Sequence, residues 1–249
     1  MAQSGTDEIQ GAETESNPLT GSKSMRWFFV CMACLLLVIV AVGFAPSFYL
    51  PNVLLPELAA TGKLTFPAYI VLHGVVLSLW YLLLFIQALL VTTKRVHIHR
   101  RLGIAGAALA AVLVPLSLFV VTRSVARSNL GALPVIGDYG LLVLFATLVT
   151  VGIRFRRKPE VHKRLMLIAS ISIAAPAIVR WPGAESALPF SFLVPQLTMF
   201  AAIIVHDIVA LRRVHPATLW GVAAYLVVVG VCVPLAFSPL GQQLLKSLK

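Results

Sequence analysis

The sequence predicts an all-α protein, a polytopic bundle of about seven transmembrane helices. Only 12% of its 249 residues are charged and 59% are hydrophobic, whereas a soluble domain carries about 25% charged residues. Apolar runs that are long enough to cross roughly 30 Å of hydrocarbon alternate with short basic segments. Because an unpaired backbone is costly in lipid, each of these runs is expected to be helical.

The chain divides into a tail, a membrane domain and a second short tail. Residues 1–24 are polar and acidic and contain no aromatic side chain, which predicts a disordered cytoplasmic tail. The transmembrane helical domain is expected over residues 25–240, and a short polar C-terminal tail over residues 241–249. No cleavage site follows the first apolar run, so that run is expected to remain as an anchor helix. The predicted spans are residues 27–49, 67–93, 103–124, 139–156, 163–180, 191–211 and 218–237.

The fifth predicted span is the weakest of the seven. It contains Ser170, Ser172 and Pro176. Polar groups and prolines within a membrane need hydrogen-bonding partners on neighbouring helices. This helix is therefore the best candidate for a place inside the bundle.

The distribution of basic residues predicts the orientation of the chain. With the N-terminus in the cytoplasm, fourteen Lys and Arg residues fall on the cytoplasmic side and six on the other side. Short cytoplasmic loops carry the excess of positive charge in membrane proteins. The sequence therefore predicts a multi-pass inner-membrane protein with a periplasmic C-terminus. The same placement explains the formal net charge of +11, so membrane lipids, and no nucleic acid, are the expected partners.

The three predicted cytoplasmic turns resemble one another. The sequence reads H-R-R-L from His99 and H-K-R-L from His162, and residues 94–97 and 212–215 match in the same way. Each turn joins a helix that enters the cytoplasm to one that leaves it. One interpretation is an anchor helix followed by three repeated hairpins. The alternative is that selection for Lys and Arg in short loops produced these matches without duplication.

Histidines on several predicted helices are candidate cofactor-binding residues. His99 and His162 open the third and fifth helices, and His206 lies near the inner end of the sixth, whereas His73 lies in the outer half of the second. Two neutral imidazoles from facing helices at one depth can bind haem b. Ionisable residues within a membrane are costly and often mark functional sites.

Asp207 follows His206 directly in the sixth predicted helix. An acidic side chain at this depth is expected to pair with a basic one. Arg154 and Arg157, on the same side of the membrane, are the candidate partners.

A polar stripe is predicted on the second helix. His73, Trp80 and Gln87 recur every seven residues, which places them on one face of a helix. Two interpretations remain open. The stripe provides hydrogen bonds between helices, or it forms the wall of a cofactor or transport cavity.

The segment HGVVLSLWYLLLFIQALLVTTKRVHIHRRLGIAG resembles a pattern in uncharacterised bacterial inner-membrane proteins in which H-R-x-L-G opens a helix. More remotely, the chain resembles the cytochrome b561-type membrane proteins, which bind haem b through histidines on neighbouring helices. This resemblance implies haem b as the cofactor and four ligand candidates, namely His73, His99, His162 and His206. Those proteins carry histidine pairs at both membrane faces, whereas here only His73 lies near the outer face.

Two functions are therefore expected. The first is a redox protein that binds haem b or a metal ion through histidines on the cytoplasmic side, and that works with a redox partner or as a homo-oligomer. The second is a small transporter or lipid-interacting protein without a cofactor, in which the histidines are structural. The sequence contains no glycine-rich phosphate loop and no H-E-x-x-H, C-x-x-C-H or G-x-S-x-G motif, so it identifies no catalytic residue.

Overall fold

The computed structural model describes residues 18–62, 66–127, 131–181 and 192–248, and these residues form helices and no strand. The all-α prediction is confirmed. In chain order the elements are α1 (Pro18–Phe44), the π-helical turn η1 (Ala45–Tyr49), α2 (Pro51–Leu54), α3 (Pro56–Ala60), α4 (Ala68–Thr92), α5 (Val96–Arg127), α6 (Ala132–Arg154), α7 (Pro159–Ser172), α8 (Ala175–Ile178), α9 (Leu193–Leu211), α10 (Pro216–Phe237) and α11 (Pro239–Ser247).

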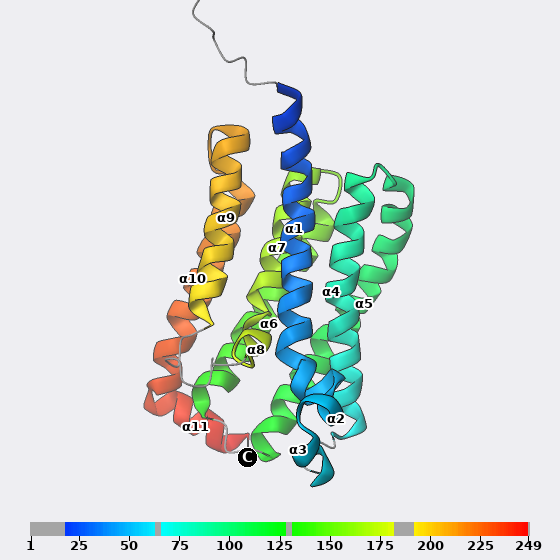
Figure 1. Cartoon of the computed structure of the whole chain (residues 1–249). Coiled ribbons are helices and arrows are strands. Elements are labelled where there is room, and N and C mark those ends of the chain that lie inside the picture. Colours follow the sequence, from blue (N-terminus) through cyan, green and yellow to red (C-terminus); the bar gives the residue numbers. More distant parts are fainter. Residues whose placement is uncertain (1–17, 63–65, 128–130, 182–191, 249) are drawn as a thin grey trace, which may run out of the picture.

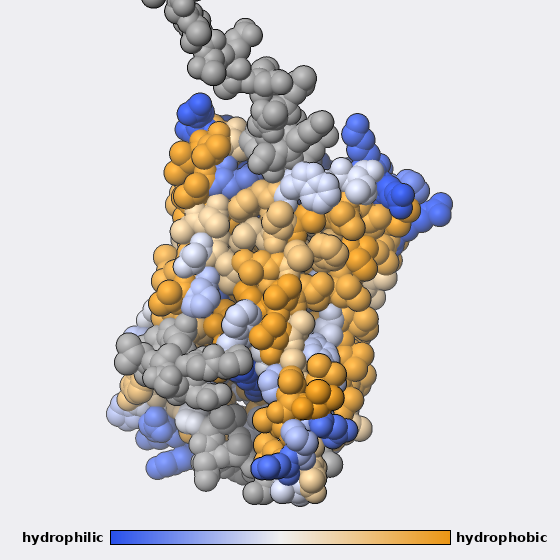
Figure 2. Space-filling view, in the orientation of Figure 1, coloured by the Kyte–Doolittle hydropathy of each residue, from blue (hydrophilic) through white to orange (hydrophobic). Residues whose placement is uncertain are grey.

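Six of these helices are long and apolar enough to cross a membrane, namely α1, α4, α5, α6, α9 and α10. They run side by side as an elongated bundle (Figure 1). Figure 2 shows apolar side chains over the middle of the bundle and polar side chains towards its two ends. This belt is the surface that a bilayer covers, so the chain is a multi-pass membrane protein.

The two ends of the bundle differ in their elements (Figure 1). One end carries the start of α1 and the turns α4–α5, α6–α7 and α9–α10, where most of the Lys and Arg residues lie. We call it the basic end. The opposite end carries the short helices α2, α3 and α11. The three turns that resemble one another in sequence therefore lie together.

The ends of the membrane domain differ from the predicted boundaries. Residues 18–24, assigned above to the disordered tail, are the first residues of α1. The helix begins at Pro18, whose ring favours the first helical turn. Residues 1–17 lie outside the described residues. Residues 241–247 of the predicted polar C-terminal tail belong to α11, which begins at Pro239.

Two of the predicted hairpins form closely packed pairs, α4 with α5 and α6 with α7. The third pair differs, because α10 packs mainly on α6 and α7 and only slightly on α9. One apolar core joins α1, α4, α5, α6, α7, α9 and α10. Its most buried side chains include Leu36, Leu113, Phe145, Ile168 and Ile203.

Candidate functional site

The fifth predicted span is the central helix of the bundle, and it is broken. α7 contains 14 residues and ends at Ser172, and α8 resumes at Ala175 for four residues. Every residue from Arg164 to Ser172 except Met166 is buried. Pro176 explains the break, because it has no N–H to donate to the Ser172 carbonyl and in a continuous helix its ring would clash with that oxygen.

Side chains from two other helices satisfy the carbonyl groups at this break. On α9, Gln196 Nε2 donates hydrogen bonds to the Ile171 carbonyl at 2.7 Å and the Ser172 carbonyl at 3.2 Å. On α10, the Tyr225 hydroxyl donates to Gln196 Oε1 at 2.6 Å and so fixes the orientation of the amide. Gln196 and Tyr225 are both fully buried. The Ile171 carbonyl also accepts from the Ala174 N–H at 3.1 Å, so it is at Ser172 that the amide takes the place of a backbone donor.

α4 holds the same part of α7 from the other side. Trp80 Nε1 donates a hydrogen bond to Ser170 Oγ at 3.1 Å, and the Tyr81 hydroxyl donates to the Ser170 carbonyl at 2.9 Å. Both aromatic side chains are buried. A buried indole or phenol needs such a polar partner, so these bonds fix the depth of α7 relative to α4.

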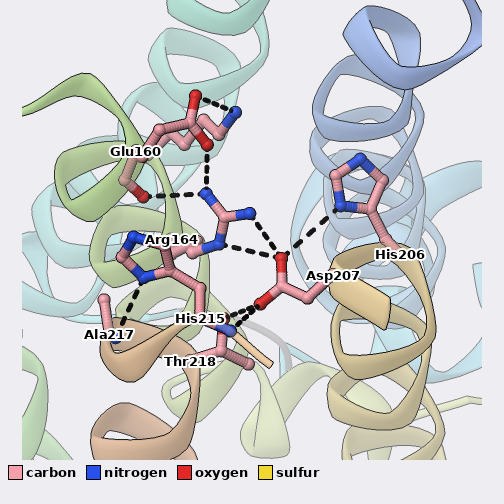
Figure 3. A network of polar contacts seen from close by, with 8 residues as sticks. Glu160, Arg164, His206, Asp207, His215, Ala217 and Thr218 are labelled. Carbon is pink, nitrogen blue, oxygen red and sulfur yellow. Dashed lines mark hydrogen bonds and ion pairs between the residues drawn. The ribbon is translucent and has the colours of Figure 1, made fainter. Parts of the chain in front are cut away.

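A buried ion pair joins α7 to α9 near the basic end (Figure 3). Arg164 Nε donates to Asp207 Oδ1 at 2.9 Å, and Arg164 Nη2 donates to the same oxygen. Arg164 Nη1 donates to the carbonyl and the carboxylate of Glu160 one turn earlier. Arg164 and Asp207 are both fully buried. Their charges are therefore matched and hydrogen-bonded within the bundle, as a low-dielectric site requires.

The second oxygen of Asp207 ties α10 into the same network (Figure 3). It accepts hydrogen bonds from Thr218 Oγ1 at 2.6 Å and from the backbone N–H of His215 at 3.1 Å. His215 precedes α10, and its Nδ1 accepts a hydrogen bond from the N–H of Ala217 at 3.0 Å. This is an N-cap, in which a side-chain acceptor satisfies an unpaired N–H of the first turn.

Two groups of this network titrate outside the membrane-spanning segments. Burial favours neutral Glu160, but hydrogen bonds from Lys163 and Arg164 outweigh it and lower the pKa of that carboxyl. Burial lowers the pKa of His215, and the positive charge of Arg164 lowers it further. Near neutral pH the network therefore holds a charged Glu160 and a neutral His215, which is the form that caps α10.

His206 lies beside this network and not beside the other candidate ligands. Its Nδ1 is 3.7 Å from Asp207 Oδ1. Its ring stacks on Phe28 of α1, with centroids 4.2 Å apart, and meets the edge of Phe29. Phe29 also lies under the ammonium group of Lys163, 4.6 Å from the ring centroid. The first membrane turns of α1 thus cover the charged network with aromatic rings, and cation–π attraction favours this contact.

The structure brings two of the predicted ligands together, His99 and His162. Each is the fourth residue of its helix, α5 or α7, and both helices start at the basic end. Their ring centroids are 6.3 Å apart, and the ring planes meet at 80°. Both rings are partly buried. The two side chains thus lie close together at the starts of their helices, whereas His206, the other histidine expected near this depth, lies apart from them.

In both the α6–α7 and the α4–α5 hairpin, the first helix forms a hydrogen bond with the histidine at the start of the second helix. His162 Nδ1 lies 2.8 Å from the Gly152 carbonyl of α6, and since a carbonyl only accepts, the proton of neutral His162 is on Nδ1. On α4, the Gln87 amide is satisfied when its oxygen accepts from the Gly103 N–H at 3.0 Å. Its nitrogen then donates to His99 Nδ1 at 2.6 Å and to the His99 carbonyl at 3.2 Å. This orientation places the proton of neutral His99 on Nε2.

The polar stripe of the second predicted helix contacts three different places. His73 Nδ1 lies 3.4 Å from Ser117 Oγ of α5, Trp80 binds α7, and Gln87 binds the start of α5. His73 lies 19 residues before the end of α4, roughly 28 Å at about 1.5 Å of rise per residue, whereas His99 is the fourth residue of α5, so the two histidines lie in opposite halves of the bundle. Each of the three residues therefore has a hydrogen-bonding partner on a neighbouring helix.

Sequence reasoning missed several residues of these networks. Asp207 pairs with Arg164 and not with Arg154 or Arg157, both of which are exposed. The basic cluster at residues 156–164 reads as one solvated turn, but α7 begins at Pro159, so Arg164 is already inside the helix. Its four-residue spacing from Glu160 was the available signal. Nothing in the local sequence pairs Gln196 with the break in α7.

The His99–His162 pair can offer two nitrogen ligands to a cofactor. Among the residues that the structure describes, no group of three or more His, Cys, Asp or Glu side chains is arranged to hold a metal ion. The chain matches no protein-family model, no curated protein and no solved structure.

Proposed function

We propose that this multi-pass membrane protein binds haem b, or a single metal ion, between His99 and His162 at its basic end. The observation that carries the proposal is the placement of the two imidazoles, 6.3 Å apart between ring centroids on two different helices. When two imidazoles bind one metal from opposite sides, their ring centroids lie roughly 6 Å apart, because each metal–nitrogen bond is about 2 Å and each centroid lies beyond its nitrogen. Haem b, when bound, supplies one-electron chemistry.

The hydrogen bonds around the two histidines support this assignment on one condition, which concerns the position of the proton on His99. Ligating histidines donate their second ring N–H to a carbonyl or carboxylate, and His162 already does so to Gly152. His99 ligates through Nε2 only when its proton moves to Nδ1. The Gln87 amide must then turn, so that its oxygen accepts from that N–H. Gln87 is therefore the residue that orients His99.

The proposal narrows the candidate ligands from four to two. His206 packs between Phe28 and Phe29, and His73 lies next to Ser117. In the proposed function these two histidines hold helices together. Exposed arginines at the same end could pair with the propionate groups of haem. They are Arg100, Arg101, Arg156 and Arg157.

A reduced-minus-oxidised visible spectrum of the purified protein, with metal analysis of the same sample, tests the proposal. We expect a haem b spectrum or about one metal ion per chain, lost in His99→Ala and in His162→Ala. The matched control is His97→Ala, an exposed histidine of the same turn, which should keep the cofactor. A wild-type protein that is folded, reconstituted with haem and metals, and still featureless would overturn the proposal.

Transport is the second candidate, favoured by the break in α7. Discontinuous helices form the solute sites of many secondary transporters, and α7 has such a break among buried polar side chains. Proteoliposomes loaded with a pH-sensitive dye would show proton flux that Gln196→Leu removes. Proton flux no faster than in empty liposomes would rule out the transport function. His73→Leu and Gln87→Leu test in the same assay whether the polar stripe lines the route.

A further inference from the structure

The C-terminal helix α11 turns sharply away from α10. Ser238 between the two helices has an extended backbone, and its Oγ accepts a hydrogen bond from the Gly241 N–H at 3.1 Å. A Cβ atom at Gly241 would lie 2.0 Å from the Leu235 carbonyl oxygen, so only glycine permits this approach. Gln242 Nε2 donates to the Ala236 carbonyl at 2.9 Å. These contacts hold α11 across the end of the bundle (Figure 1).

α11 has three faces. Gly241 and Leu245 are buried, and Leu245 packs in a small core with residues of α5, α6 and α10. At about 100° per residue, the three exposed leucines fall within an arc of about 80° next to that buried face. They are Leu240, Leu244 and Leu248. The remaining arc is polar and exposed, and consists of Gln242, Gln243, Lys246 and Ser247.

The leucine face continues the surface that meets lipid. On α10 the exposed side chains Val227, Val231 and Phe237 are 63%, 59% and 66% accessible, and Leu240 follows at 56%. Leucines this exposed on a helix with an opposite polar face are typical of helices that lie in a membrane interface.

We propose that α11 is an interfacial membrane helix. Its leucine face enters the boundary between acyl chains and headgroups, and its polar face meets water. The partner is the bilayer surface itself. The short helices α2 and α3 at the same end expose a similar apolar set, namely Val53, Leu54 and Leu58. This end is therefore anchored by apolar insertion, and the other end by its Lys and Arg side chains.

Nitroxide labels on α11 in phosphatidylcholine nanodiscs test this inference. Single cysteines replace Leu244 or, as a matched control, Gln243, in a chain whose Cys31, Cys34 and Cys232 are changed to serine or alanine. Both sites are exposed and adjacent in sequence. We expect the label at 244 to collide with oxygen dissolved in lipid, and the label at 243 with a water-soluble nickel complex. A label at Leu240→Cys should behave as the label at 244 does.

Two outcomes would overturn the inference. If the labels at 240 and 244 collide with the nickel complex as often as the label at 243 does, α11 lies in water. If they are shielded from both reagents and show dipolar broadening between chains, a second copy of the protein covers the leucine face. The measurement needs no cofactor, so it is independent of the proposed function.

Discussion

Arg164 and Asp207 form a charge pair within the membrane domain, and its environment decides what each substitution does. Both side chains are fully buried. Hydrogen bonds from Thr218 and from the backbone N–H of His215 satisfy the second oxygen of the Asp207 carboxylate. Removing one member of a buried pair leaves the other charge without compensation, whereas removing both does not. The pair thus fixes the mutual position of α7, α9 and α10.

We expect Arg164→Met to destabilise the protein strongly, by about 3 kcal/mol or more, because it leaves the buried Asp207 unpaired. The double variant Arg164→Met with Asp207→Leu should recover much of this loss. Unfolding in detergent measures both, with Arg157→Met, an exposed arginine of the same end, as the control. A double variant that is no more stable than Arg164→Met would show that the pair itself supplies the stability.

His215 should make stability depend on pH. Its pKa in the folded protein is lowered by burial and by Arg164, so the unfolded chain binds a proton first as the pH falls. Stability from neutral His215 is complete above about pH 6.5, the ordinary histidine value, and is lost as the pH falls from there towards the lowered pKa.

His215→Asn is the matched variant for this prediction, since asparagine also accepts a hydrogen bond at an N-cap but does not titrate. Thermal unfolding at pH 7.5 and pH 5.5 should show a smaller loss of stability in His215→Asn than in the wild type. The same loss in both proteins would assign the dependence to other groups. Glu160 contributes only at lower pH, below its ordinary value of 4.5.

At the scale of elements, the break between α7 and α8 shows how one proline sets the requirements of its neighbours. Pro176 removes the donor for the Ser172 carbonyl, and Gln196 on α9 supplies another. Tyr225 on α10 then fixes the amide. A defect in one helix is thus satisfied by two others, which is how membrane proteins retain prolines in their helices.

Gln196→Leu should therefore destabilise the protein by about 1–3 kcal/mol, since it leaves the buried Ser172 carbonyl without its side-chain donor and the buried Tyr225 hydroxyl without its acceptor. The loss should be smaller when Pro176→Ala is also present, because residue 176 then has an N–H for the Ser172 carbonyl. A double-mutant cycle of unfolding free energies measures this coupling. Strictly additive effects would mean that Gln196 does not substitute for the missing N–H.

At the scale of the whole molecule, the basic end and the opposite end are built for different surroundings. The three basic turns and the start of α1 lie together, and α2, α3 and α11 lie at the other end (Figure 1). The excess of Lys and Arg predicts that the basic end faces the cytoplasm.

Labelling of intact bacterial cells with a membrane-impermeant maleimide checks this orientation. In a chain without its own cysteines, Lys246→Cys on α11 should react from outside, whereas Arg157→Cys should react only after the inner membrane is opened. Both residues are exposed. The reverse pattern would place the basic end outside and overturn the predicted topology.

The sequence by itself determined the class of protein and the position of most helices. Apolar runs of sufficient length have one solution in lipid, a helix, and six of the predicted spans are continuous helices long enough to cross the membrane. The fifth prediction, a weak span suited to the bundle interior, matches the central but broken α7.

Only the tertiary structure decided the partners of the polar side chains. Local sequence does not show that Asp207 meets Arg164 across 43 residues, or that Gln196 caps the break in α7 across 24 or 25. Nor does it show that His206 packs on α1 apart from the other histidines. Hydropathy sets which segments enter the membrane, one segment at a time. The pairing of buried polar groups depends on how helices pack side by side, and that is a property of the whole bundle.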